Sequence, residues 1–164
     1  MGAFSRSRRR RRLTPVLLAA LALGACPAAP DSPEAQVRAL FAEAESAAED
    51  KDVADLKRLV SERYADASGN DRQAIAGLLT YNFLRNQTVH LLTRIHAIEF
   101  PEPRRSTATL FVAMGGAPIL GVDELARVRA DLYRFDFDLA DEGAGSWRVT
   151  RAAWRRATAD DFLP

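Results

Sequence analysis

The sequence predicts an α+β domain in which three N-terminal helices precede about four antiparallel strands. Two observations support this. From Pro33 to about Asn86, apolar residues recur three or four positions apart, the spacing of helices that bury one face. From Val89 onward, apolar and polar residues alternate in stretches bounded by prolines and glycines, as in half-buried strands. The whole pattern fits one domain.

The first helix is expected over residues 33–49, because Ser32 followed by Pro33 is typical of a helix start. Asp52 can cap a second helix that ends near Tyr64. Asn70 or Asp71 can cap a third helix that reaches about residue 86. Their predicted buried faces contain Val37, Leu40, Phe41, Ala44 and Ala48, then Val53, Leu56, Leu59, Val60 and Tyr64, then Ile75, Leu78, Leu79 and Phe83.

Four strands are expected over residues 89–100, 106–114, 126–139 and 146–158, with residues 115–125 left unassigned. Apolar and charged residues alternate most clearly in the third strand. Its aromatic and apolar positions share one face, and its charged positions share the other. The glycine-containing turn at 141–145 makes the last two strands an antiparallel hairpin. The apolar face of the third strand consists of Tyr133, Phe135, Phe137 and Leu139.

The first 26 residues have the features of an export signal. Six arginines precede the apolar run Leu13–Leu23, which is too short for a permanent transmembrane helix of roughly 20 apolar residues. The run leads through Gly24 and Ala25 to Cys26, the only cysteine. This Leu-Gly-Ala-Cys motif resembles the lipobox of bacterial lipoproteins, in which the cysteine receives lipid and becomes the new N-terminus.

The resemblance implies that residues 1–25 are a signal peptide that is removed, and that residues 26–32 are the lipidated cysteine and a tether. It also implies a lipoprotein carrying palmitate-type lipid, attached to the bacterial cell envelope membrane and facing the periplasm. Pro27 is not the aspartate of an inner-membrane retention signal, which favours the outer membrane. The alternative is an ordinary secretory signal cleaved without lipidation. Export by the general secretory route is favoured over the twin-arginine route, because arginine repeats create arginine pairs by chance.

Charge and cysteine content restrict the classes of partner. The leader carries six of the 23 basic residues and none of the 22 acidic residues, so the remaining chain is mildly acidic. It lacks the basic excess of a nucleic-acid-binding protein, and no nucleic-acid partner is expected. With no cysteine beyond Cys26, an exported domain has no disulfide framework and depends on its packed core.

Three helices followed by four strands, with aromatic positions on one face of the closing hairpin, resemble the nuclear transport factor 2-like fold. The residues that carry the resemblance are the stripe Val37, Leu40 and Phe41, and the segments 64–72, 133–139 and 147–156. It implies a single domain over residues 33–164 whose sheet curves around the helices as a cone. The superfamily includes ketosteroid isomerases, polyketide cyclases, limonene epoxide hydrolases and many noncatalytic members, so the fold does not fix the function.

A cone-shaped sheet leaves its interior partly unfilled, so aromatic residues can line an apolar pocket. The predicted ligand-binding residues are Tyr64, Asn82, Tyr133 and Trp147. Asn82 lies beside the apolar stripe of the third helix, where an amide needs partners or lines a pocket. The leading hypothesis is a noncatalytic domain that binds a small apolar ligand or an envelope protein.

The alternative hypothesis is a small acid–base isomerase, cyclase or hydrolase that uses Asp136, His90 or Tyr64. Ketosteroid isomerases use an aspartate base in this fold. However, Asp136 and Asp138 lie opposite the aromatic face of their strand. There they are expected to point to water and to pair with Arg148 or Arg156 across the hairpin.

His90 and His96 are expected on one strand face with Arg94 between them. No third ligand lies close in sequence and a cation stands between the two histidines, so no metal site and no cofactor are expected. A further hypothesis is a homodimer formed through the outer face of the sheet. It would place Arg94, Arg134 and Arg148 at the interface.

Overall fold

The computed structural model describes residues 32–125 and 127–163. Three helices are followed by four strands, as the sequence predicted. The predicted signal peptide, the lipidation site Cys26 and most of the tether lie outside the described residues. Within the described part, no helix is long and apolar enough to cross a membrane. The elements are α1 (Pro33–Glu49), α2 (Val53–Leu59), α3 (Arg72–Arg85), β1 (His90–Glu102), β2 (Arg105–Gly115), β3 (Asp131–Asp141) and β4 (Trp147–Arg156), with short 3₁₀ helices at Val122–Glu124 and Ala159–Phe162.

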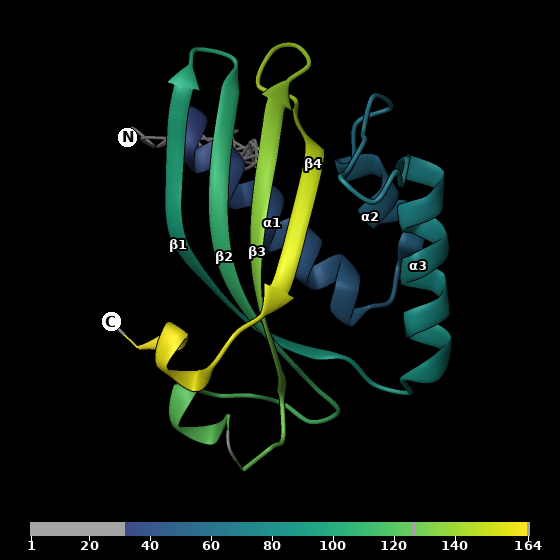
Figure 1. Ribbon diagram of the computed structural model, residues 1–164, viewed down its shortest axis with the longest axis vertical. Coiled ribbons are helices and arrows are strands. Elements are labelled where there is room, and N and C mark those ends of the chain that lie inside the picture. The colour runs from purple at the N-terminus through teal and green to yellow at the C-terminus, as the bar shows by residue number, and fades with distance from the viewer. Residues whose placement is uncertain (1–31, 126, 164) are drawn as a thin grey trace, which may run out of the picture.

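The four strands form one antiparallel sheet in the order β1-β2-β3-β4. Irregular pairing interrupts β1 between Ile95 and Ala97, and interrupts the β3–β4 ladder after Asp138. Such bulges bend a strand and increase its twist. Figure 1 shows the resulting curved sheet, with α1 crossing its concave face and with α2 and α3 beyond the β4 edge. The predicted cone is confirmed.

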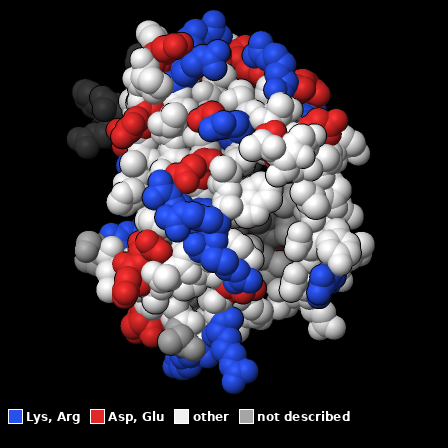
Figure 2. All heavy atoms as spheres, viewed as in Figure 1, with Lys and Arg blue, Asp and Glu red and all other residues white. Residues whose placement is uncertain are grey.

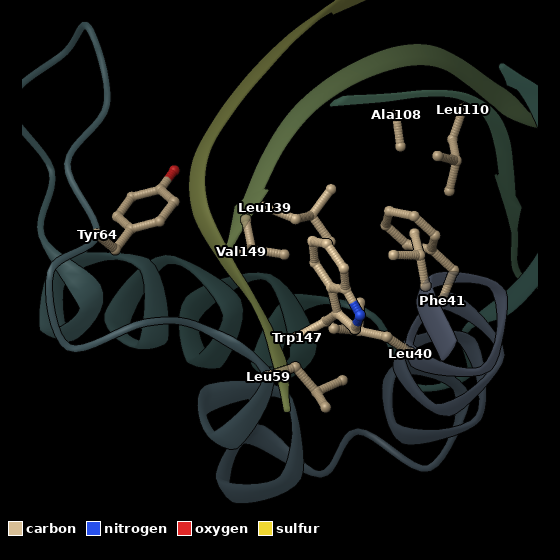
Figure 3. Close-up of a cluster of buried hydrophobic side chains, with 10 residues drawn as sticks. Leu40, Phe41, Leu59, Tyr64, Ala108, Leu110, Leu139, Trp147 and Val149 are labelled. Atoms are coloured by element: carbon tan, nitrogen blue, oxygen red, sulfur yellow. The ribbon is translucent and has the colours of Figure 1, made fainter. Parts of the chain in front are cut away.

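Helix α1 supplies the apolar stripe around which the sheet curves. The Ser32 hydroxyl accepts a hydrogen bond from the Ala35 backbone at 3.1 Å, and Pro33 occupies the first turn. Val37 and Phe41 are buried against the sheet, and the Phe41 and Phe137 ring centroids lie 5.3 Å apart. This packing forms the main core (Figure 3), made of Val37, Leu40, Phe41, Leu59, Tyr64, Ala108, Leu110, Leu139, Trp147 and Val149.

Trp147 joins the start of α1 to the sheet and closes one end of the cone. Its indole N–H donates to Gln36 Oε1 at 3.0 Å, and its ring meets Phe100 of β1 edge-to-face at 5.7 Å between centroids. Only 3% of the tryptophan is exposed. A buried ring with its one polar atom satisfied is a stabilising core residue.

The predicted end of the second helix near Tyr64 is wrong, because α2 stops at Leu59. Val60 is extended and forms a bridge with Val149 of β4. The next backbone N–H, of Ser61, donates to the Val149 carbonyl at 2.9 Å. Pairing with the edge of β4 satisfies backbone groups that a longer helix would have satisfied internally.

Helix α3 is held mainly by its ends and by α2. Asp71 caps its start through a hydrogen bond from the Ala74 backbone at 2.8 Å. Arg72 Nε donates to the Lys57 carbonyl of α2 at 2.9 Å. At the other end, the Lys51 ammonium group donates to the carbonyls of Asn86 and Gln87 at 3.1 and 3.0 Å. A cation there is favourable because it faces the negative end of the helix dipole.

The third strand begins at Asp131, five residues later than predicted. Ala126, the predicted first residue, lies outside the described residues. The preceding segment turns through the 3₁₀ helix at Val122–Glu124 and through Arg129, whose φ of 50° is left-handed. These turns are incompatible with an extended strand.

A second apolar core lies on the convex face of the sheet. The C-terminal segment folds back onto this face and buries Phe162, whose ring centroid lies 5.7 Å from that of Phe111 in β2. Arg94 of β1 donates to the Phe162 carbonyl. The buried members of this second core are Phe111, Ala113, Ile119, Leu125 and Phe162.

Replacing Phe162 tests this arrangement. Phe162 has no exposed surface, so Phe162→Ala should lower the free energy of unfolding by about 3–5 kcal/mol, the usual cost of deleting a buried phenyl ring. Urea titration measures the change. Leu163→Ala is the matched control, because Leu163 is more than half exposed and its loss should cost under about 0.5 kcal/mol. Equal effects would contradict the packing.

Candidate functional site

The concave face of the sheet carries a row of aromatic side chains that the helices cover only in part. Tyr133, Phe135 and Phe137 alternate along β3, and Trp154 lies opposite Phe135 in the register of β4. Ring centroids lie 6.1 Å apart for Tyr133–Phe135, 5.6 Å for Phe135–Phe137 and 6.4 Å for Phe135–Trp154. The Phe135 and Phe137 planes are within 4° of parallel. We call these four residues the aromatic wall.

The path of α1 explains why the aromatic wall remains partly open. Towards its C-terminal end, α1 approaches β1: Glu49 accepts from the Leu91 backbone at 2.8 Å. Helix α1 therefore does not extend over the Tyr133 end of β3. Helix α3 contacts the main core through Ile75, while Leu79 and Phe83, on the same helical face, are half-buried.

The aromatic wall is accordingly only partly covered by protein. Trp154 is 46% exposed, and the three rings on β3 are half-buried. Figure 2 shows uncharged residues surrounding a hollow between β4 and α3. An apolar concave surface with exposed aromatic rings is a common form of binding site for small molecules.

One charged group stands at the end of the aromatic wall. Tyr133 lies opposite Arg156 in the β3–β4 register, and the guanidinium carbon lies 4.8 Å from the Tyr133 ring centroid. Arg156 also pairs with Asp131 at 2.5 Å. The Asp131 hydrogen bond is the largest cause of the raised pKa of Arg156. The arginine therefore remains charged beside the apolar rings.

Of the four predicted ligand-binding residues, only Tyr133 belongs to the aromatic wall. Tyr64 is buried at the β4 edge. Burial, followed by the charge of Asp66, raises its pKa to about 12. Asn82 is exposed on α3 and donates to the Leu78 carbonyl of its own helix at 2.9 Å. Among the described contacts, none joins the side chains of Tyr64, Asn82 and Tyr133 to one another.

Trp147 lies at the closed end of the cone instead. It borders a hollow of about 250 Å³ together with Gln36, Leu40 and Leu59. Its indole N–H is already bonded to Gln36. The sequence identified it as a large aromatic residue, but its neighbours make it part of the core.

The three candidate catalytic residues do not line the aromatic wall. Asp136 lies on the convex face and accepts from Arg134 and from the Thr109 hydroxyl, the latter at 2.8 Å. These contacts, Arg134 first, hold the pKa of Asp136 below its usual value. Tyr64 is at the β4 edge. His90 lies beside Glu49, with Nδ1 and Oε1 4.0 Å apart. This geometry brings no two of the three residues together.

Asp136 and Asp138 form ion pairs with other arginines than those expected from the sequence. Asp138 pairs with Arg151 at 2.9 Å and Asp136 pairs with Arg134 at 2.7 Å, so the expectation of Arg148 or Arg156 is wrong. The irregular pairing after Asp138 shifts the register. Arg148 donates to the Trp147 carbonyl instead, at 2.7 Å.

The bulge in β1 places His96 as an extra residue beside Phe111, with ring centroids 5.5 Å apart. Within the described residues, no group of three or more histidine, cysteine, aspartate or glutamate side chains is arranged to hold a metal ion. His96 is thus an aromatic neighbour of the second core.

The sequence did not indicate one partly buried carboxyl group, that of Glu45. Glu45 of α1 is half-buried and bonded to the Thr93 side chain. Burial is the largest cause of its raised pKa, and Glu49 raises it further. Its burial could have been predicted from its position one turn after Phe41, since residues i and i+4 share a helix face.

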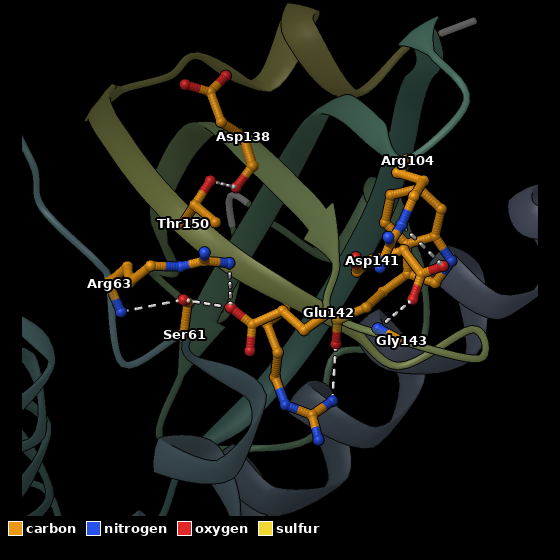
Figure 4. Close-up of polar contacts among 10 residues, drawn as sticks. Ser61, Arg63, Arg104, Asp138, Asp141, Glu142, Gly143 and Thr150 are labelled. Atoms are coloured by element: carbon orange, nitrogen blue, oxygen red, sulfur yellow. Dashed lines mark hydrogen bonds and ion pairs between the residues drawn. The ribbon is translucent and has the colours of Figure 1, made fainter.

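Polar residues gather at the end of the sheet formed by its hairpin turns (Figure 4). The Ser61 hydroxyl is almost fully buried and donates to Glu142 Oε1 at 2.7 Å, while Arg63 contacts the same oxygen at 3.1 Å. A surface hollow of about 360 Å³ is nearby. Arginines and carboxylates pair around it, so its charges neutralise one another. The charged residues are Arg63, Arg104, Arg105, Glu102, Asp141 and Glu142.

The fold is similar to that of solved nuclear transport factor 2-like structures. A ketosteroid isomerase-like protein of Erwinia carotovora atroseptica matches with a TM-score of 0.58 and 12% identity over 79% of this chain and 99% of that one. A putative scytalone dehydratase of Novosphingobium aromaticivorans gives 0.61 and 12%, over 75% and 83%. A nuclear transport factor 2-like protein of unknown function from Shewanella oneidensis gives 0.56 and 11%, over 75% and 98%.

The chain spans 40% of a further match, Bd1075 of Bdellovibrio bacteriovorus, with a TM-score of 0.59, 7% identity and 74% of this chain covered. No protein-family model and no curated protein matches the sequence. At these identities the similarity establishes the fold alone. The chain therefore has the nuclear transport factor 2-like fold, with three helices on an open four-stranded antiparallel sheet.

The Glu142 contacts predict acid-sensitive stability. Hydrogen bonds from Ser61 and then from Arg63 lower the pKa of Glu142, so its stabilising contribution is present above the unfolded-state pKa. It is lost as pH falls through the folded-state pKa. Glu142→Gln should cost about 1 kcal/mol at pH 7, because it removes a charge-assisted acceptor that is only partly shielded from water.

Urea titrations of both proteins from pH 7 to pH 3 measure this difference, which should shrink towards the acid end. Glu102→Gln is the control, because Glu102 and its partner Arg105 are both mostly exposed. A Glu142→Gln deficit that stays constant with pH would contradict the assignment.

Proposed function

We propose that this protein is a lipid-anchored domain of the bacterial cell envelope that binds a small apolar molecule at the aromatic wall without converting it. The observation that carries the proposal is the partly covered row of four rings, in which Phe137 packs against Phe41 while Trp154 is about half exposed. Burying such rings under an apolar ligand is favourable, because each removes apolar surface from water. An envelope protein as partner remains the second form of the binding hypothesis.

The acid–base enzyme is the alternative, and Glu45 is the observation that favours it. A half-buried carboxyl with a raised pKa is a candidate general acid or base. Its side chain, however, bonds to Thr93 of β1, on the side of α1 away from Trp154. Asp136, His90 and Tyr64 lie outside the aromatic wall, so binding has the stronger geometric support.

A copurifying ligand is the most direct test of binding. Native mass spectrometry of the Cys26→Ser chain, purified gently from bacterial envelopes, should show an additional small-molecule mass. Trp154→Ala should weaken the affinity about tenfold and so lower the occupied fraction, because lost ring contacts are worth about 1.4 kcal/mol.

Leu84→Ala is the matched control for that experiment. Leu84 is a large apolar residue that is 82% exposed on α3, so its loss should leave occupancy unchanged. A clean ligand-free mass for the parent protein would contradict tight binding of a small molecule. Equal occupancy in Trp154→Ala would place the ligand elsewhere.

Lipid attachment has a separate test. Cells expressing the protein and fed radiolabelled palmitate should incorporate label into the parent chain, and Cys26→Ser should abolish incorporation, because the thiol is the expected acceptor. Membrane fractionation should show the matching loss of attachment. An unlabelled parent chain that is still exported would indicate an ordinary cleaved secretory signal.

A further inference from the structure

We infer that the aromatic wall selects an elongated apolar molecule that ends in a single anionic group, such as a carboxylate, and that Arg156 binds this group. The inference rests on the proposed binding function and adds the chemistry of the ligand. It follows from the arrangement of the rings, from the position of Arg156, and from the weakness of the ion pair between Arg156 and Asp131.

The rings specify the apolar part. Three successive inward side chains of β3 place aromatic rings in a row, with centroid separations of 6.1 and 5.6 Å. Phe135 and Phe137 are stacked, and the neighbouring Trp154 extends the aromatic surface onto a second strand. An elongated apolar molecule covers such a row better than a compact one does.

Arg156 specifies the polar part. Its guanidinium lies over the Tyr133 ring, the last ring of the row, and this contact holds the group in place by a cation–π interaction. Within the described residues, Asp131 is the carboxylate that pairs with it, through Nη1. A guanidinium has five N–H donors, so one such contact leaves capacity for a ligand anion.

The existing ion pair is easily exchanged. The Arg156 side chain is 66% exposed and that of Asp131 is 61% exposed, and pairs between exposed groups contribute little to stability. A ligand that buries its apolar part against the rings brings its anion close to Arg156. It can then share or replace Asp131, and bidentate pairing with a carboxylate favours an arginine at this position.

The test compares 1-pyrenebutyrate with its uncharged methyl ester, which have the same apolar ring system. Titration of the Cys26→Ser chain, followed by fluorescence anisotropy, should give about tenfold tighter binding of the acid. Arg156→Met should remove that preference by weakening acid binding while leaving ester binding unchanged. Asp131→Asn should strengthen acid binding, because it removes the competing carboxylate.

Arg155→Met is the matched control. Arg155 is the neighbouring residue of β4 but lies opposite Arg134, and so on the convex face. Its loss should preserve the preference for the acid, and thermal unfolding of each variant checks that the fold is intact. Equal binding of acid and ester, both lost in Trp154→Ala, would overturn the anion assignment while leaving the aromatic wall as the binding site. Failure of both probes to bind would contradict the assignment of an elongated apolar ligand as well.

Discussion

The packing of α1 into the concave face of the sheet is the contact on which the remaining structure depends. Phe41 against Phe137 fixes the helix over the middle of the sheet, and Gln36 with Trp147 fixes its start at the closed end. An amphipathic helix and a curved sheet each bury their apolar face only against the other. The direction of α1 then decides which part of the concave face is covered and which part is accessible.

The open part of the concave face follows from this geometry. Since α1 ends beside β1 and α3 is tied mainly to α2 and Lys51, the rings near the end of β3 lack a complete covering of protein. Core interiors are normally packed as densely as organic crystals. The half-buried rings on the concave surface are the basis of the proposed ligand binding, whereas Trp147, with its polar atom satisfied, is explained by folding.

The two faces of the sheet have different roles. The concave face holds the main core and the aromatic wall, while the C-terminal segment covers part of the convex face through Phe162. The arginines expected at a dimer interface have partners within the chain: Arg94 contacts the Phe162 carbonyl, and Arg134 contacts Asp136. Homodimerisation through this face stays a hypothesis. It requires an interface that accommodates the C-terminal segment.

Sequence periodicity determined the number and order of the helices and strands, the start of α1 and the alternation along β3, because these depend on local hydrogen bonding and on which face is apolar. It could not determine where α2 ends, since Val60 pairs with β4, about ninety residues away in the chain. Nor could it separate Trp147 from Trp154. Both are aromatic residues of one strand, but only the tertiary structure buries one beside Gln36 and leaves the other exposed next to Phe135. A binding site is built from residues distant in sequence, and their meeting depends on the bulges and the helix direction that three-dimensional packing decides.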